Sequence, residues 1–236
     1  MTRLSTEFQD LGDIKVAYWQ HGSGPDLLLL HGNSESKVIF AHYMLEHFAG
    51  FHTWALDSRC HGESQSDDEN LAIEQIADDV IHFCQAKGIQ RASVIGYSDG
   101  GNIALFLAKK APQLFPKVVA VSPNTLVSGT EDGTLRLFKA VYGVIRFFGK
   151  LGFKVKKQLM VIDLMLNDIG LSFEDLKTIK TNVKVLYAEK DMIKEQHIKD
   201  IAAAIPGSTL EKIPACTHLN IMESPTAVKI MREYLA

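Results

Sequence analysis

Short, almost wholly apolar runs alternate with longer helical patterns along most of this chain, and that alternation constrains the fold more than any other feature. The runs 26–30, 53–56, 92–95 and 118–121 are nearly all apolar, as strands are when helices cover both faces of a parallel sheet. Strands that alternate with helices predict an α/β fold with a doubly wound, mostly parallel sheet. The other expected elements are strands at 14–19, 183–187 and 210–213, and helices at 37–48, 71–87, 102–110, 193–204 and 227–235.

One stretch, 123–176, breaks this alternation, because it shows helical patterns without a convincing strand between them. Near its end, Ser172-Phe173-Glu174-Asp175 resembles a capping box that opens a short helix. We therefore predict one core domain formed by 1–122 and 177–236, with 123–176 inserted as a small helical cap above the sheet.

The composition excludes several classes of protein. The net charge of −3 lacks the basic excess of a nucleic-acid binder. Three cysteines without a pairing pattern are typical of reduced thiols. The first ten residues contain no apolar h-region, and no nearby apolar run approaches the ~20 residues of a membrane helix. We expect a soluble cytoplasmic protein, monomeric or homodimeric, with no nucleic-acid partner and no stable membrane association.

The sharpest motif is Gly96-Tyr97-Ser98-Asp99-Gly100, which lies between an apolar strand and a helical pattern. In a G-x-S-x-G sequence the serine occupies a sharp strand-to-helix turn, and the small glycines let the chain pass closely there. The turn exposes the Ser98 hydroxyl and places the Asp99 N–H at a helix N-terminus, where it can bind an oxyanion. We predict that Ser98 is a nucleophile.

A second turn, His31-Gly32-Asn33, directly follows the apolar strand 26–30. Ligands of α/β proteins bind at this carboxyl edge of the sheet. The Asn33 N–H is the expected second oxyanion donor, whereas His31 is interpreted as a structural residue that holds the turn by hydrogen bonds.

The acid and the base follow later strands. Asp191 comes shortly after the strand 183–187, with Glu189 as the competing acid, and His218 follows the last strand. The residues after 118–121 include no carboxylate, which favours Asp191. His218 completes the order Ser, Asp, His. Five other histidines lie in or beside helical or strand patterns and are expected at the surface: His42, His47, His52, His82 and His197.

These three side chains predict nucleophilic catalysis. A serine hydroxyl needs a base within hydrogen-bond reach, and the carboxylate fixes the tautomer of that base. We expect acylation of Ser98, followed by attack of water activated by His218. No cofactor is expected and no metal, because no His/Cys spacing forms a ligand set and the acidic run 67–69 is interpreted as a solvated loop.

Together with Asp57-Ser58-Arg59-Cys60-His61-Gly62-Glu63-Ser64, these motifs make nearly the whole chain resemble the α/β-hydrolase superfamily. The resemblance implies a structural role for the 57–64 block. The Gly-Tyr-Ser-Asp-Gly-Gly elbow is similar to that of valacyclovirase-like hydrolases, which implies that Asp99 binds a substrate ammonium. We expect Asn33, Tyr97 and Asp99 to contact the substrate.

The helical insertion conflicts with the expectation that the substrate carries an ammonium group. Between 134 and 157 it contains seven basic residues and no acid, together with apolar residues at helical spacing. Attraction of anionic substrates or of a lipid surface is one interpretation, and a solvated face over an apolar pocket lining is the favoured one. The leading hypothesis is hydrolysis of a small carboxylic ester. Hydrolysis of a thioester, an amide or a carbon–carbon bond stays open, as does a ligand-binding protein on the same scaffold.

Overall fold

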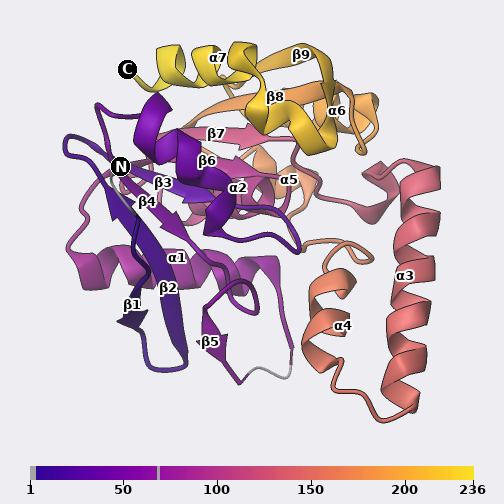
Figure 1. Cartoon of the computed structure of the whole chain (residues 1–236). Helices are drawn as coiled ribbons and strands as arrows, with labels where there is room; N and C mark the ends of the chain where they lie inside the picture. The colour runs from indigo at the N-terminus through magenta and orange to yellow at the C-terminus, as the bar shows by residue number, and fades with distance from the viewer. Residues whose placement is uncertain (1–3, 68–69) are drawn as a thin grey trace.

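The computed structural model describes residues 4–67 and 70–236 (Figure 1). Parts of two stretches discussed above, residues 1–3 of the N-terminus and residues 68–69 of the acidic run, lie outside the described residues. None of the helices in the described part of the chain combines the length and apolar character that crossing a membrane requires.

The described strands form one mixed sheet in the order β1-β2-β4-β3-β6-β7-β8-β9, with β5 paired to β2. Every neighbouring pair from β4 to β9 is parallel, and β1, β2 and β5 add antiparallel pairs at one side. The predicted α/β class with a mostly parallel sheet is confirmed, whereas β1 and β5 were not predicted. The strands are β1 (Glu7–Asp10), β2 (Ile14–His21), β3 (Asp26–Leu30), β4 (His52–Leu56), β5 (Gln65–Ser66), β6 (Ala92–Tyr97), β7 (Lys117–Val121), β8 (Asn182–Lys190) and β9 (Thr209–Thr217).

Helices cover both faces of this sheet, which explains why its central strands are apolar throughout. Alternate residues of β3 belong to two separate cores, with Leu28 and Leu30 on one face and Leu27 and Leu29 on the other. Figure 1 shows α7 on one side of the sheet and α1 on the other. The first face is covered by α1 (Ile73–Lys87), α2 (Asp99–Lys110), α5 (Phe173–Leu176) and α6 (Glu195–Ala204), and the second by α7 (Pro225–Leu235) and the turns η1 (Lys37–Phe40) and η2 (Tyr43–His47).

The prediction of one α-helix over 37–48 is wrong, because a 3₁₀ turn and a π-helix occupy that stretch. Its buried apolar side chains are Phe40, Tyr43, Met44 and Phe48, a pattern that an ordinary α-helix also satisfies, so the sequence does not distinguish these turn types. The start is held by Lys37, whose backbone N–H and Nζ both donate to the buried carboxylate of Asp57 at 2.7 Å.

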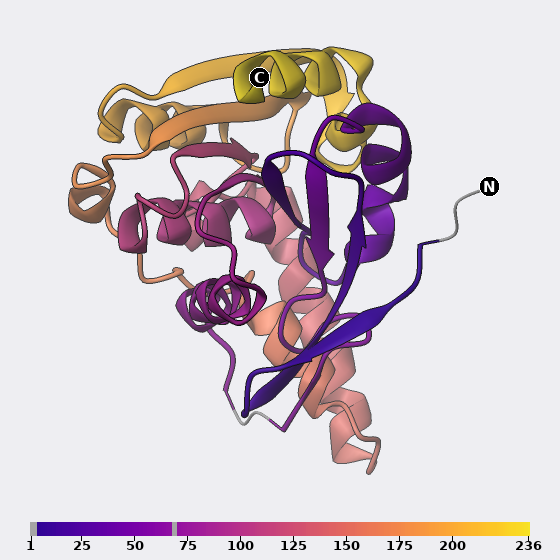
Figure 2. The same cartoon turned by 90° about the vertical axis from the view of Figure 1, so that its left-hand side faces the viewer.

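The segment 123–176, which the structure describes throughout, contains no strand beyond an isolated bridge of Thr130 to Ile193. Besides α5 it holds η3 (Val127–Gly129), α3 (Asp132–Lys150) and α4 (Lys156–Asp163). The helices α3 and α4 pack side by side as a hairpin (Figures 1 and 2). The predicted capping box is confirmed, since Ser172 Oγ accepts the Asp175 N–H at the start of α5.

Candidate active site

The turn between β6 and α2 holds Ser98 in a conformation that few residues adopt. Ser98 has φ 55° and ψ −117°, in the positive-φ region that disfavours side chains. The flanking glycines make the close passage possible: a Cβ on Gly96 would lie 2.0 Å from the carbonyl oxygen of Gly100, and one on Gly100 would lie 2.0 Å from that of Leu30. The strand–turn–helix context therefore forces the Ser98 hydroxyl out at the carboxyl edge of the sheet.

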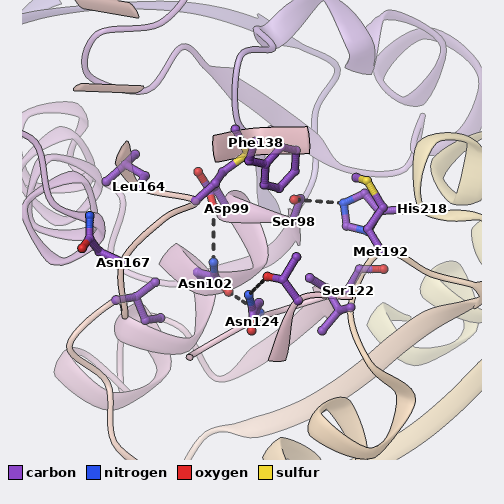
Figure 3. A pocket seen from close by; sticks show the side chains of 14 residues that line it. Ser98, Asp99, Asn102, Ser122, Asn124, Phe138, Leu164, Asn167, Met192 and His218 are labelled. Carbon is purple, nitrogen blue, oxygen red and sulfur yellow. Dashed lines mark hydrogen bonds between the residues drawn. The ribbon is translucent and has the colours of Figure 1, made fainter. Parts of the chain in front are cut away.

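The structure brings Ser98, His218 and Asp191 into one hydrogen-bonded chain. His218 Nε2 lies 3.1 Å from Ser98 Oγ (Figure 3), and His218 Nδ1 lies 2.6 Å from Asp191 Oδ1. Because a carboxylate only accepts, Nδ1 is the donor, which leaves Nε2 free to accept the serine proton. The three residues come from the carboxyl ends of β6, β8 and β9, which the parallel register brings to one edge.

Asp191 is held by four donors. Oδ1 accepts from His218 Nδ1 and the Ile193 N–H, and Oδ2 accepts from Ser122 Oγ at 2.6 Å and the Ala188 N–H. Burial acts to raise the pKa of Asp191. The hydrogen bonds that it accepts from His218, Ser122 and Ala188, together with the electrostatic effect of His218, outweigh burial, so the pKa lies below its ordinary value.

The competing acid, Glu189, occupies a different place. Its Oε2 accepts the backbone N–H of Ala215 at 2.8 Å. Of the two carboxylates considered from sequence, the hydrogen bond to His218 is therefore made by Asp191.

Ser122 is a site residue that sequence reasoning missed. It directly follows β7 with φ 51°, and its hydroxyl donates to Asp191. The sequence reading of this position considered only the absence of a carboxylate. The signal available was its place after a central strand, next to the strand that carries the acid.

The two expected oxyanion donors belong to segments that adjoin Ser98. Asp99 is the first residue of α2, so its N–H has no intrahelical acceptor. The turn that contains Asn33 packs against Ser98: a Cβ added to Gly32 would lie 3.1 Å from Ser98 Cβ. The Asn33 side chain donates to Asp99 Oδ2 at 2.9 Å and to the carbonyl of Val161 in α4 at 2.7 Å.

Asp99 is itself a buried carboxylate next to Ser98. Burial raises its pKa, while hydrogen bonds from the neutral amides of Asn33 and Asn102 act in the opposite direction. The Asp99–Asn102 contact is visible in Figure 3.

Tyr97 lies beneath the site. Its side chain is buried, its hydroxyl donates to the backbone carbonyl of His218 at 2.8 Å, and its ring packs 5.3 Å from the imidazole. Tyr97 therefore supports the base. It was expected among the substrate contacts, but it does not line the cavity described next.

A small cavity of about 50 Å³ opens directly on Ser98, Asp99 and His218 (Figure 3). Part of its wall comes from the core, and the rest from the segment 123–176, including Phe138 of α3 and Leu164 just after α4. Its full lining is Ser98, Asp99, Asn102, Ser122, Asn124, Thr130, Phe138, Leu164, Met165, Asn167, Ile169, Met192, Ile193 and His218.

His31 shapes the turn that precedes Asn33. Its Nδ1 donates to the Gly32 carbonyl and its Nε2 accepts the Ser58 N–H. The second bond requires the neutral ring, because a protonated Nε2 cannot accept. Burial lowers the pKa of His31 to about 4, with the neighbouring His61 as a further cause.

The 57–64 block contacts that turn through the Ser58 N–H and is itself held by buried ionic contacts. Asp57 is buried and accepts from Lys37 and from the Glu63 N–H, and Arg59 makes a buried ion pair with Asp79.

His197 was expected at the surface, and that expectation is wrong. It is buried on α6, where its Nε2 accepts the backbone N–H of Thr125 at 3.3 Å and its ring contacts Phe173. The reason is that the segment 123–176 covers this face of α6, which no local pattern around His197 records.

In the described part of the chain, no cluster of three or more His, Cys, Asp or Glu side chains is arranged to hold a metal ion. The three cysteines are buried and form no disulfide.

A mostly parallel sheet, a serine on a strained strand-to-helix turn and a hydrogen-bonded Ser–His–Asp chain at its carboxyl edge define the hydrolase class of α/β proteins. The family model described as the alpha/beta hydrolase fold matches residues 25–148, more than half of the chain. The chain therefore belongs to the α/β-hydrolase family.

Similar curated proteins include 2-(acetamidomethylene)succinate hydrolase of Mesorhizobium japonicum. It is 30% identical over 112 residues, which cover 48% of this chain and 40% of that protein. The dihydrolipoyllysine-residue acetyltransferase component of the acetoin cleaving system of Cupriavidus necator is 34% identical over 133 residues, covering 54% and 35%. The chain thus matches less than half the length of these relatives.

Solved structures extend the likeness to the whole chain. E-2-(acetamidomethylene)succinate hydrolase superimposes with a TM-score of 0.83 at 17% identity over 99% of both chains. A carboxylesterase from Bacillus subtilis gives 0.78 at 18% identity, over 100% of this chain and 92% of that one. At these identities the superposition establishes the fold.

Proposed function

We propose that this protein is a serine hydrolase that cleaves small carboxylic esters through an acyl-enzyme on Ser98. The observation that carries the proposal is the hydrogen-bond chain Ser98–His218–Asp191, which ends at a cavity with the serine in its wall. A binding protein has no need to hold a serine hydroxyl in a strained turn against an imidazole whose orientation is fixed by a buried carboxylate.

In the proposed reaction, Ser98 Oγ attacks the carbonyl carbon while His218 Nε2 takes the serine proton. The N–H groups of Asn33 and Asp99 stabilise the oxyanion, and each such donor is typically worth about 10²–10³ in rate. His218 then returns the proton to the leaving alcohol oxygen. A water, deprotonated by His218, attacks the acyl carbon, and the carboxylic acid leaves as Ser98 regains its proton.

The cavity supports a small substrate. About 50 Å³ of space is open above the nucleophile, and Phe138, Leu164, Met165 and Ile169 supply apolar walls. We propose that 123–176 acts as a cap over a core formed by 1–122 and 177–236, because it supplies these walls. The proposed cytoplasmic location is supported by three buried thiols that form no disulfide.

Asp99 directs the proposal towards substrates with a positive charge near the acyl carbon. Its carboxylate lines the cavity and its hydrogen-bond partners are neutral amides, so an ammonium group would supply the missing charge. The same carboxylate disfavours anionic substrates. We therefore expect aminoacyl esters to be better substrates than their desamino analogues, and the succinate derivative named in the M. japonicum relative to be a poor one.

An isosteric change tests this preference. In Asp99→Asn the ratio of kcat/KM for an aminoacyl ester over its desamino analogue should fall at least about tenfold, since one charge contact is lost. An unchanged ratio would show that Asp99 does not bind a substrate ammonium, and it would not affect the proposal of ester hydrolysis.

The primary test is hydrolysis of a short-chain p-nitrophenyl ester series by wild type, Ser98→Ala and the control Ser128→Ala. Ser128 is an exposed serine of η3. We expect Ser98→Ala to lose turnover and labelling by a fluorophosphonate probe, while Ser128→Ala keeps both. A wild type that neither turns over esters nor reacts with the probe makes a ligand-binding role the better explanation. Turnover limited to thioesters, amides or carbon–carbon bonds would support the proposed roles of Ser98, His218 and Asp191 but would replace the ester as the proposed substrate.

A further inference from the structure

The helix α3 carries an exposed apolar stripe beside its half-buried face, and one member of the stripe, Val141, also lines a surface cavity with core residues such as His61 and Gly62. No side chain of α3, all of which the structure describes, is fully buried. Its half-buried face, which includes Phe138 and Tyr142, is directed towards the rest of the protein. A second set of apolar residues recurs every three or four positions and is exposed: Leu137, Val141, Val144, Phe148 and Leu151, with Phe147 beside them.

The stripe ends in an aromatic cluster at the tip of the α3–α4 hairpin. Phe147 and Phe153 are 57% and 61% exposed, and Phe148 contacts both rings at centroid distances of 6.0 and 5.5 Å. In both Figure 1 and Figure 2 the hairpin projects from the body of the protein, with this tip at its free end. Exposed apolar surface gathered in this way usually marks an interaction site.

The charge around the tip restricts what can cover it. The seven basic residues between 134 and 157 surround the stripe without a single acid in that range: Arg136, Lys139, Arg146, Lys150, Lys154, Lys156 and Lys157. The whole chain has a net charge of −3, so the positive charge is concentrated here. Asp67 shares a surface cavity with the three lysines of 154–157 and offsets part of it.

We propose that the α3–α4 tip docks reversibly on an anionic lipid surface, with Phe147, Phe148, Leu151 and Phe153 entering the interface between headgroups and acyl chains. An amphipathic helix with aromatic side chains and flanking lysines binds such surfaces through apolar burial and electrostatic attraction together. A second copy of this chain fits the tip less well, because pairing two tips would bring two sets of positive charges together. The contact is peripheral and requires no membrane-spanning segment.

Vesicle flotation tests the proposal on the full chain. Vesicles of phosphatidylcholine alone are compared with vesicles of phosphatidylcholine and phosphatidylserine. We expect binding to the anionic vesicles only, weakened by 0.5 M salt. Each lysine near the surface contributes about fivefold to partitioning, so Lys150→Glu/Lys154→Glu should reduce binding at least about tenfold. Phe147→Ser/Phe153→Ser should cause a similar loss by removing apolar burial.

A matched control places the same changes elsewhere on the surface. Val38 is 58% exposed and Lys180 is also exposed, both outside the hairpin. Val38→Ser/Lys180→Glu should bind vesicles as wild type does. All three double variants should keep wild-type turnover of a soluble ester, so the outcome is independent of the proposed ester hydrolysis.

Three results overturn the proposal. The first is absence of binding to anionic vesicles at low salt. The second is binding that neither pair of hairpin substitutions weakens. The third is concentration-dependent dimerisation in sedimentation that Phe147→Ser/Phe153→Ser abolishes, which assigns the tip to a second copy of the chain.

Discussion

Replacing Asp191 by asparagine probes the hydrogen-bond network at its most constrained point. Each carboxylate oxygen accepts two donors: His218 Nδ1 and the Ile193 N–H at Oδ1, and Ser122 Oγ and the Ala188 N–H at Oδ2. Asparagine keeps one oxygen and replaces the other by an NH₂ group. Whichever way the amide points, that NH₂ faces a backbone N–H, so one buried donor loses its acceptor.

Both orientations of the amide have a calculable consequence. With NH₂ towards His218, Nδ1 must accept, so the proton moves to Nε2 and the ring can no longer take the proton of Ser98; the loss is about 10⁴ in kcat. With NH₂ towards Ser122, the serine hydroxyl can turn to accept, but the Ala188 N–H cannot. In either case the unsatisfied donor lowers the free energy of unfolding by about 1–3 kcal/mol.

The assay is kcat/KM for a p-nitrophenyl ester together with denaturant unfolding of the same preparations. Glu189→Gln serves as the control, since its amide oxygen can still accept the Ala215 N–H. We expect Asp191→Asn to lose about 10⁴ in kcat with NH₂ towards His218, and at least about tenfold with NH₂ towards Ser122, because the carboxylate charge that stabilises the imidazolium is then missing; Glu189→Gln should stay within about threefold. A folded Asp191→Asn with more than about a tenth of wild-type activity refutes the reasoning, as does a large loss in Glu189→Gln.

Three further predictions follow from single contacts. Tyr97→Phe removes the hydroxyl that binds the His218 carbonyl, so the free energy of unfolding should fall by about 1–2 kcal/mol and kcat should fall with KM unchanged; a rise in KM alone would instead make Tyr97 a substrate contact. The pKa of His31 falls from 6.5 to about 4 on folding, so below pH 6.5 the unfolded chain takes up a proton that the folded chain refuses. The contribution of His31 to the free energy of unfolding is complete above pH 6.5, and about 3 kcal/mol of it is lost as the pH falls to 4. Between pH 7 and pH 4 the free energy of unfolding should therefore fall less steeply in His31→Gln than in wild type. Gly96→Ala should destabilise the fold by about 3 kcal/mol or more because its Cβ would clash with the Gly100 carbonyl, whereas Gly143→Ala, with open space around it in α3, should stabilise it by about 0.5–1 kcal/mol; equal effects at the two glycines would contradict both assignments.

Much of the site could be predicted because its signals are local in the sequence. Gly96 and Gly100, on either side of Ser98, indicate a backbone that passes too closely for a Cβ. The apolar run before them indicates a buried strand. Asp191 follows β8, whose buried apolar run is equally local, and His218 follows β9, where the apolar signal is limited to a few residues. Because parallel strands present their carboxyl ends at one edge, the order of the motifs was enough to place the three residues together.

The contacts that escaped prediction are those between residues far apart along the chain. Ser122 contacts Asp191, 69 positions away, and Asn33 contacts Val161, 128 positions away. Polar side chains such as these look alike in any loop, since nothing near them in sequence encodes which backbone or carboxylate will approach. His197 was misplaced for the same reason, because a covering segment buried it.

By itself, the sequence determined the α/β class, the turn that carries Ser98 and the strand ends that Asp191 and His218 follow, because chain periodicity and glycine geometry are properties of a few neighbouring residues. Only the tertiary structure decided between Asp191 and Glu189 as the partner of His218, since both follow the same strand and differ in what approaches them. It also decided which apolar face of α3 stays uncovered, because exposure is set by whatever packs against a helix, and the amphipathic pattern alone does not specify that neighbour.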